Sequence, residues 1–257
     1  VLGLSGGIDS ALSLAICRDA LGSNRVHALM MPSRFTSQQS LDLAQEQAEM
    51  MGIDYRVISI EPTLEAMSET LTEAMAGQPG GVTHENLQAR IRGMTIMAFS
   101  NRYGWLPIAT SNKSELAVGY STLYGDMCGG FAPINDCLKT RVYALARYRN
   151  EVSAIIPEGV IGRAPSAELR PDQTDQDSLP PYDILDEILR LFVDMDQSIE
   201  KIASRGYDES TVRRVASMVL ASEYKRRQGA PGVRVTSRGF GRDRRYPITS
   251  GWRENTT

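Results

Sequence analysis

The sequence holds few of the residues that build disulfide frameworks or zinc sites. Its 257 residues include only three cysteines, Cys17, Cys128 and Cys137, and two histidines, His27 and His84. The odd number of cysteines argues against a disulfide framework, and the absence of Cys-x-x-Cys spacing argues against a zinc site. We therefore predict a protein of the reducing cytoplasm.

Long apolar runs and a strong charge of one sign are also lacking. No uninterrupted apolar stretch approaches the ~20 residues that span a bilayer, and no signal peptide is visible. The formal net charge is −3 and the hydrophobic content is 42%. These values predict a soluble globular protein, long enough for one large α/β domain or a domain with appendages.

The first ten residues join an apolar strand, Val1–Leu4, to a glycine-rich turn, Ser5–Ser10, that opens a helix. Two glycines let consecutive N–H groups point inward, and the helix adds its positive N-terminal end. Such a nest suits phosphate. It is not a Walker A loop, because no Gly-Lys-Ser/Thr follows. The alternative is an ordinary strand-to-helix turn in which Asp9 and Ser10 cap the helix.

Strand-like and helix-like segments alternate through the first half of the chain. Such alternation predicts right-handed βαβ units and a doubly wound parallel sheet covered by helices on both faces. We expect this nucleotide-binding α/β core to occupy residues 1–150. After the first strand and helix, the predicted strands are Arg25–Met31, Tyr55–Ile60 and Trp105–Ala109, and the predicted helices are Gln39–Met51, Pro62–Ala76 and a long helix capped by Thr83 that ends near Tyr103.

The second half, residues 151–257, reads as an extension of loop, helices and basic tail. A proline-rich acidic stretch, Pro165–Pro181, precedes two amphipathic helices at about Tyr182–Arg205 and Ser210–Arg227. The tail Lys225–Arg253 carries nine Lys and Arg against one acidic residue. Because Pro, Gly and aromatic residues interrupt it, we predict contact with a phosphorylated small molecule or an acidic neighbouring subunit, and neither nucleic acid nor membrane as partner.

Two polar loops, Ser5–Ser10 and Thr110–Glu115, follow predicted strand ends. Ligands of open parallel sheets lie outside the carboxyl ends of the strands, so both loops are expected to converge on one crevice. Asp9 and Glu115 would there supply two hard oxygen ligands for Mg²⁺ on a nucleotide. The alternative is that each acid only stabilises its helix N-terminus, by about 1 kcal/mol.

The predicted long helix carries Asn86 and Arg90 four residues apart, hence on one face. An amide beside a guanidinium can hold a carboxylate, a ribose or a phosphate. On spacing alone, however, a solvated helix face is the more common interpretation of this pair. Three further segments are rich in polar residues that packing rarely needs: Gly119–Asp126, Lys139-Thr140 and Ala164–Leu169.

The Ser-Gly-Gly-Ile-Asp-Ser loop resembles that of the ATP pyrophosphatases, which cleave ATP to AMP and pyrophosphate. Nearly the whole chain resembles the synthetase domain of the glutamine-dependent NAD⁺ synthetases, although Arg149–Ile161 is shorter than in that family. The motifs that carry the resemblance are Gly3–Ser10, Met31–Arg34, Asn86–Arg92, Thr110–Glu115, Tyr124–Asp126, Pro165–Asp175, Ser178–Asp183, Lys225–Arg227 and Phe240–Pro247.

The resemblance implies a Rossmann-like α/β fold and a two-step reaction. ATP would adenylate the nicotinate carboxylate of deamido-NAD⁺ and release pyrophosphate, and ammonia would then displace AMP to give NAD⁺. Asp9, Lys139 and Glu115 would be catalytic, with Asp9 and Glu115 on Mg²⁺. The implied ATP site is Gly3, Leu4, Ser5, Gly6, Gly7, Ile8, Asp9, Ser10, Thr110, Lys139 and Ser166, and the implied deamido-NAD⁺ site is Asn86, Arg90, Glu115, Asp126 and Lys225.

The resemblance also implies partners. Family members pair through a two-fold interface, so we expect at least a homodimer. Glutamine-dependent relatives carry an upstream glutaminase that delivers ammonia. Because the chain starts at Val1 inside a predicted strand, we expect that domain to be absent from it, and the chain to use free ammonia. The competing readings are a GMP synthetase-like or asparagine synthetase-like amidotransferase, and an inactive nucleotide-binding module.

Overall fold

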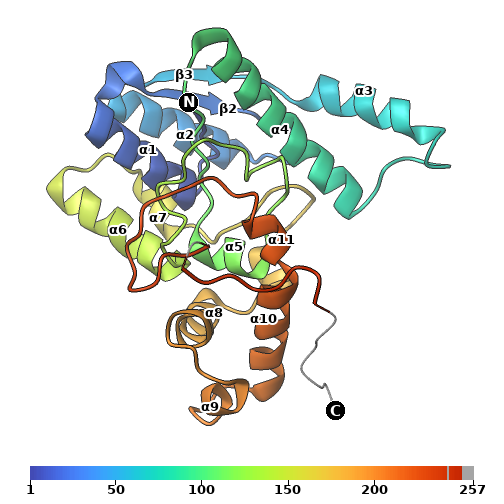
Figure 1. Ribbon diagram of the computed structural model, residues 1–257. Coiled ribbons are helices and arrows are strands. Elements are labelled where there is room, and N and C mark those ends of the chain that lie inside the picture. The colour runs from blue at the N-terminus through green and yellow to red at the C-terminus, as the bar shows by residue number, and fades with distance from the viewer. Residues whose placement is uncertain (242, 251–257) are drawn as a thin grey trace.

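A short parallel sheet forms the centre of the computed structural model, which describes residues 1–241 and 243–250 (Figure 1). Its strands β1 (Leu2–Gly3), β2 (His27–Met30) and β3 (Asp54–Val57) lie in the order β1-β2-β3. Leu2 pairs with Ala28, and His27 pairs with Asp54. Each strand is shorter than predicted, and the predicted strand Trp105–Ala109 is reduced to Ile108, which bridges Leu2 and Phe131.

Helices cover both faces of the sheet, which confirms the predicted α/β class. Alternate residues of β2 point to opposite sides. Ala28 and Met30 pack in a core with α1 (Ile8–Leu21), α2 (Gln38–Met51), α6 (Lys139–Val152) and α7 (Glu158–Gly162). On the other side, Leu29 and Met31 pack with α3 (Glu61–Thr72) and α4 (Val82–Tyr103).

A second group of helices lies below the sheet in Figure 1 and has its own apolar core. It comprises α5 (Lys113–Val118), α8 (Tyr182–Leu189), a π-helical turn (Arg190–Asp194), α9 (Ile199–Ala203) and α10 (Glu209–Ala221). The single predicted helix Tyr182–Arg205 was therefore wrong. Asp196 adopts a left-handed backbone with φ +57°, and the Ser198 side chain caps the new helix α9 by accepting from Lys201 N.

The predicted helix Ser210–Arg227 also divides, at Ser222, into α10 and α11 (Glu223–Arg226). The basic tail then folds back onto the core instead of extending into solvent. The buried Asp136 accepts hydrogen bonds from Val235 N (2.8 Å) and Thr236 N (2.9 Å). It also forms an ion pair with the buried Lys113. Arg242 and residues 251–257 of this tail lie outside the described residues.

The segment that looked short, Arg149–Ile161, contains the end of α6, a tight turn and most of α7. Asn150 closes the turn: its Oδ1 accepts from Ile155 N (3.1 Å) and Ile156 N (3.0 Å), and its Nδ2 donates to Ile156 O (2.7 Å). Among the helices of residues 1–241 and 243–250, none is both long and apolar enough to cross a bilayer.

Helix α4 begins at Val82 with Gly81 as N-cap, so the prediction that Thr83 caps it was wrong. It contains Gly93, which helix propensity disfavours. A Cβ at this position would lie 2.7 Å from Tyr124 O and 2.9 Å from Gly125 O. The helix therefore needs glycine there because the loop that carries Asp126 lies directly against its backbone.

We expect Gly93→Ala to lower the free energy of unfolding by about 1–3 kcal/mol, the usual range for overpacking. The sign is opposite to helix propensity, which favours Ala by about 1 kcal/mol. Urea denaturation measures the difference. Gly80→Ala is the control, because a Cβ there meets no heavy atom of the described residues within 4 Å. A G93A protein as stable as the parent would contradict the close approach.

Candidate active site

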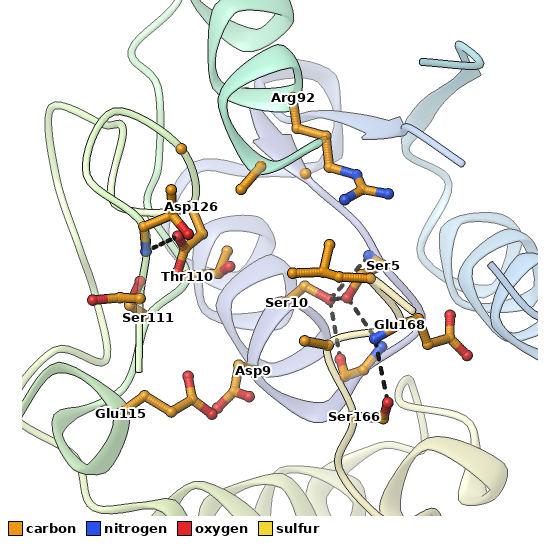
Figure 2. A pocket seen from close by; sticks show the side chains of 18 of the residues that line it. Ser5, Asp9, Ser10, Arg92, Thr110, Ser111, Glu115, Asp126, Ser166 and Glu168 are labelled. Atoms are coloured by element: carbon orange, nitrogen blue, oxygen red, sulfur yellow. Dashed lines mark hydrogen bonds between the residues drawn. The ribbon is translucent and has the colours of Figure 1, made fainter. Parts of the chain in front are cut away.

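A cavity of about 530 Å³ lies outside the carboxyl ends of β1 and β2, enclosed by the Ser5–Ser10 loop, α4, α5 and the segment 163–178 (Figure 2). It brings together fourteen of the sixteen site residues predicted from the sequence; Gly6 and Arg90 lie outside its lining. The fourteen are Gly3, Leu4, Ser5, Gly7, Ile8, Asp9, Ser10, Asn86, Thr110, Glu115, Asp126, Lys139, Ser166 and Lys225.

The glycine loop curls as a phosphate-binding turn does. Gly6 has φ +77°, and a Cβ on it would lie 2.4 Å from Ser40 O, so both conformation and space require glycine. Ser10 Oγ accepts from Ser5 N (3.2 Å) and donates to Gly7 O (3.0 Å). Because Gly7 is the N-cap of α1, Asp9 and Ser10 are not its caps. Ser10 instead shapes the loop, and the Asp9 carboxylate faces the cavity.

Three charged side chains from three helices meet beside this loop. Lys139, at the start of α6 and 2% exposed, places Nζ 2.5 Å from Asp9 Oδ2 and 2.8 Å from Glu115 Oε1. Asn112 aligns both acids, since its Nδ2 donates to Asp9 Oδ1 (2.9 Å) and its Oδ1 caps α5 by accepting from Glu115 N (3.0 Å). Figure 2 shows the carboxyl groups of Asp9 and Glu115 turned toward each other.

Burial sets the charges of this cluster. It raises the pKa of Glu115 to about 7, against the attraction of Lys139 and together with the repulsion of Asp9. Burial alone would lower the pKa of Lys139, but Asp9 and Glu115 together raise it above its ordinary value. Lys139 therefore stays protonated. Because its raised pKa leaves Glu115 only partly ionised near neutral pH, a further cation beside Asp9 and Glu115 would favour the ionised form of Glu115.

The oxygen donors of Asp9 and Glu115 fit Mg²⁺ carried by a nucleotide. Within residues 1–241 and 243–250 no three His, Cys, Asp or Glu side chains gather as a metal cage. Mg²⁺ does not need one, because it commonly binds one or two carboxylates and completes its shell with phosphate oxygens and water.

A second polar group lies on the loop Gly119–Gly125, away from Asp9. Thr122 Oγ1 donates to Asn86 Oδ1 (2.7 Å), and Thr122 N donates to Asp126 Oδ1 (2.6 Å). Lys225 Nζ donates to Gly119 O (2.8 Å) and Ser121 O (2.7 Å). Asn86, Asp126 and Lys225 thus converge on one loop, as the prediction that they share a ligand requires.

Arg90 does not join them. Its side chain is exposed, and its Nε donates to Leu123 O (3.3 Å) from outside the cavity. The α4 residue that lines the cavity instead is Arg92, whose Nε donates to Met31 O (2.9 Å). Burial lowers the pKa of Arg92 to about 10. A half-buried guanidinium that lines a cavity is a binding group for a carboxylate or phosphate.

The sequence held a signal for this correction. The residues of α4 that line the cavity include Asn86, Ala89, Arg92, Gly93 and Ile96. They recur at helical spacing, and two of them are small enough to leave room for a ligand. The spacing of four residues between Asn86 and Arg90 instead pointed to the adjacent face of α4, where Arg90 is exposed outside the cavity.

The segment 163–178 lies beside the glycine loop. Arg163 pairs with Glu168, and both side chains bind Ser40 Oγ at the start of α2, at 2.5 Å from Arg163 and 2.9 Å from Glu168. Ser166 Oγ donates to Gln173 O (2.6 Å). Figure 2 shows Ser166 and Glu168 beside Ser5 and Ser10, so this segment borders the end of the cavity at the glycine loop.

Tyr182 and Asp175 are polar neighbours of Glu115 that the sequence did not single out. Tyr182 Oη lies 2.7 Å from Asp175 Oδ2 and 3.2 Å from Glu115 Oε1. Both stand in sequence motifs that carried the resemblance, but no spacing rule indicated that a tyrosine at the start of α8 reaches a carboxylate of α5.

Comparison with known proteins gives the family. The family model described as NAD synthase matches residues 1–229. The glutamine-dependent NAD(+) synthetase of Acinetobacter baylyi is 55% identical over 255 residues, 98% of this chain and 47% of that protein. This chain thus spans about half the length of the curated relatives that it matches.

Two solved structures agree. That of glutamine-dependent NAD+ synthetase from Acinetobacter baumannii in complex with adenosine diphosphate has 49% identity and a TM-score of 0.63, over 99% of this chain and 46% of that chain. The NH3-dependent NAD synthetase from Campylobacter jejuni has 31% identity and a TM-score of 0.68, over 87% of this chain and 84% of that chain. The chain belongs to the NAD synthase family.

Proposed function

We propose that this chain is the synthetase unit of an NAD⁺ synthetase, a ligase that forms a carbon–nitrogen bond. The carboxylate of deamido-NAD⁺ attacks the α-phosphorus of ATP, pyrophosphate leaves, and ammonia displaces AMP from the acyl adenylate to give NAD⁺. The observation that carries the proposal is the Lys139 ammonium held between Asp9 and Glu115 beside a phosphate-binding loop. Because the chain belongs to the NAD synthase family, we favour this reaction over those of other amidotransferases.

The nucleotide is expected to lie against the glycine loop. The loop N–H groups and the N-terminus of α1 suit its phosphates, with Thr110 and Ser166 at the edges of the same cavity. Asp9 and Glu115 would hold Mg²⁺, which would neutralise charge on the triphosphate. Lys139, kept protonated by its two carboxylates, stabilises the charge that develops as pyrophosphate leaves.

Deamido-NAD⁺ is expected at the Gly119–Gly125 end of the cavity, among Asn86, Asp126 and Lys225. Arg92 is an added candidate there, because its half-buried guanidinium lines the cavity and can pair with a carboxylate or phosphate. Glu115 faces both ends and can serve metal, substrate or both. We propose that the core 1–150 and the extension 151–257 act as one unit, because the cavity takes residues from each.

The proposal is tested by pyrophosphate release from the purified chain with ATP, Mg²⁺ and deamido-NAD⁺. We expect turnover with ammonium and none with glutamine alone, since the ammonia-using relative from Campylobacter jejuni is matched over most of its own length. Xanthosine monophosphate and aspartate serve as control acceptors. ATP binding without turnover would instead favour a binding module, and glutamine hydrolysis would refute the ammonia-only expectation.

Asp9→Asn should reduce kcat by about 100- to 1000-fold, because a preorganised charged group at such a site contributes about 3–4 kcal/mol to transition-state stabilisation. Thermal unfolding should be little changed. Asp183→Asn is the control: Asp183 is exposed in the first turn of α8, so it tests loss of a helix-terminal charge alone. If the D9N enzyme turned over nearly as fast as the parent, Asp9 would have no catalytic role and would only stabilise the N-terminus of its helix.

We further propose that the chain pairs with a second copy through the outer face of α4. That face exposes Met94 (59%) and Met97 (37%) next to Arg90, an apolar strip beside a cation at the rim of the cavity. A partner packed there would bring Arg90, which its own cavity leaves out, into a shared site.

Sedimentation velocity should show a dimer or a larger assembly, and Met94→Glu should shift it to a monomer, because a charge buried in an interface is costly. Met67→Glu, a matched change at an exposed methionine of α3, is the control. A fully active monomeric parent would refute the pairing.

A further inference from the structure

The hydroxyl group of Tyr182 lies between two buried carboxylates. It is 2.7 Å from Oδ2 of Asp175 and 3.2 Å from Oε1 of Glu115. The ring of the same tyrosine lies under Lys139, with Nζ 5.2 Å from the ring centroid. One side chain thus contacts both Glu115 and Lys139 and a third acid that the proposed mechanism does not use.

Removing the hydroxyl has a defined electrostatic consequence. Asp175 is only 4% exposed and repels Glu115. A hydroxyl between them supplies a polar bridge that two desolvated carboxylates otherwise lack. Without it, Glu115 is free to turn away from Asp175, and the Lys139 ammonium follows its carboxylate partner.

Asp175 also ties this cluster to the segment that covers the phosphate end of the cavity. The backbone carbonyl of Asp175 accepts from Ser178 N (3.1 Å) and Leu179 N (2.9 Å), which closes the C-terminal end of segment 163–178. Toward its N-terminal end, the same segment places Ser166 and Glu168 beside the glycine loop. The contact from Tyr182 to Asp175 is therefore a direct link between this cover and the Lys139–Glu115 pair.

We propose that Tyr182 is a positioning residue. Its hydroxyl and ring fix the orientation of Glu115 and Lys139, and its contact with Asp175 fixes them relative to the segment 163–178. This inference rests on the proposed function, because it assigns Tyr182 to the same reaction. Tyr182 need not exchange a proton with substrate. Its effect comes from the orientation of the two groups that face the triphosphate.

Packing and hydroxyl can be separated at this position. Tyr182 begins α8 and packs at the edge of the core built by Leu185, Ile188 and Leu189. Phenylalanine keeps that packing and the ring under Lys139. It removes only the hydroxyl that contacts Asp175 and Glu115. Leucine removes the ring as well. A graded loss from Tyr to Phe to Leu is therefore the signature of both contacts.

We expect Tyr182→Phe to lower kcat for pyrophosphate release by about 10- to 100-fold, the range that a misplaced catalytic group produces. The KM for ATP should stay within about threefold, and the thermal midpoint within a few degrees. Tyr182→Leu should lose more. Tyr207→Phe is the control, since Tyr207 packs on the same core without lining the cavity.

A double-mutant cycle tests the link itself. Asp175→Asn combined with Tyr182→Phe should lower kcat no further than the worse single variant, because both remove one connection. Additive losses would mean two independent effects and would overturn the link. A Y182F enzyme with the kcat of the parent, or one whose loss matches an equal loss of folded protein, would overturn the positioning role.

Hydrogen–deuterium exchange of the ATP-bound chain supplies a readout that needs no turnover. Y182F should speed exchange of the amides of residues 163–178, and Y207F should not. Unchanged exchange in Y182F refutes the link to the cover. If the parent releases no pyrophosphate, the proposed function fails, and exchange alone then decides whether Tyr182 holds this segment.

Discussion

The site depends on keeping one ammonium charged in a place where burial opposes the charge. Lys139 is almost completely enclosed, and burial alone would lower the pKa of a lysine there. Asp9 and Glu115 prevent this, and each comes from a different helix whose start faces the sheet edge. The strand ends, the glycine loop and the capping amide of Asn112 are arranged so that these three side chains meet.

Elements with a strong local signal could be predicted from the sequence. The glycine loop could be predicted because Gly6 and Gly7 stand between an apolar strand and a helix. The alternation of strand-like and helix-like segments predicted the covered parallel sheet. Spacing was less reliable for choosing a helix face: Asn86 faces the cavity as expected, but Arg92, not Arg90, accompanies it. Arg90 lies outside the cavity of the single chain because its side chain leaves α4 on the exposed side, so its predicted role stays a proposal.

Features set by tertiary contacts could not be predicted. Ile108 alone continues the sheet where a full strand was expected, since the chain turns at once toward Thr110. The helix from Tyr182 breaks where Asp196 turns left-handed, a conformation that periodicity does not register. Tyr182 itself carried no local sign of function, because its partners come from segments 67 and 7 residues away.

Ser40 occupies an unusual junction. Its backbone carbonyl is the atom that forbids a side chain at Gly6, and its hydroxyl accepts a hydrogen bond from Arg163 and donates one to Glu168. The Ser5–Ser10 loop and the segment 163–178 consequently contact the same residue, in the first turn of α2. A displacement of Ser40 would therefore alter the space beside Gly6 and the contacts of Arg163 and Glu168 together.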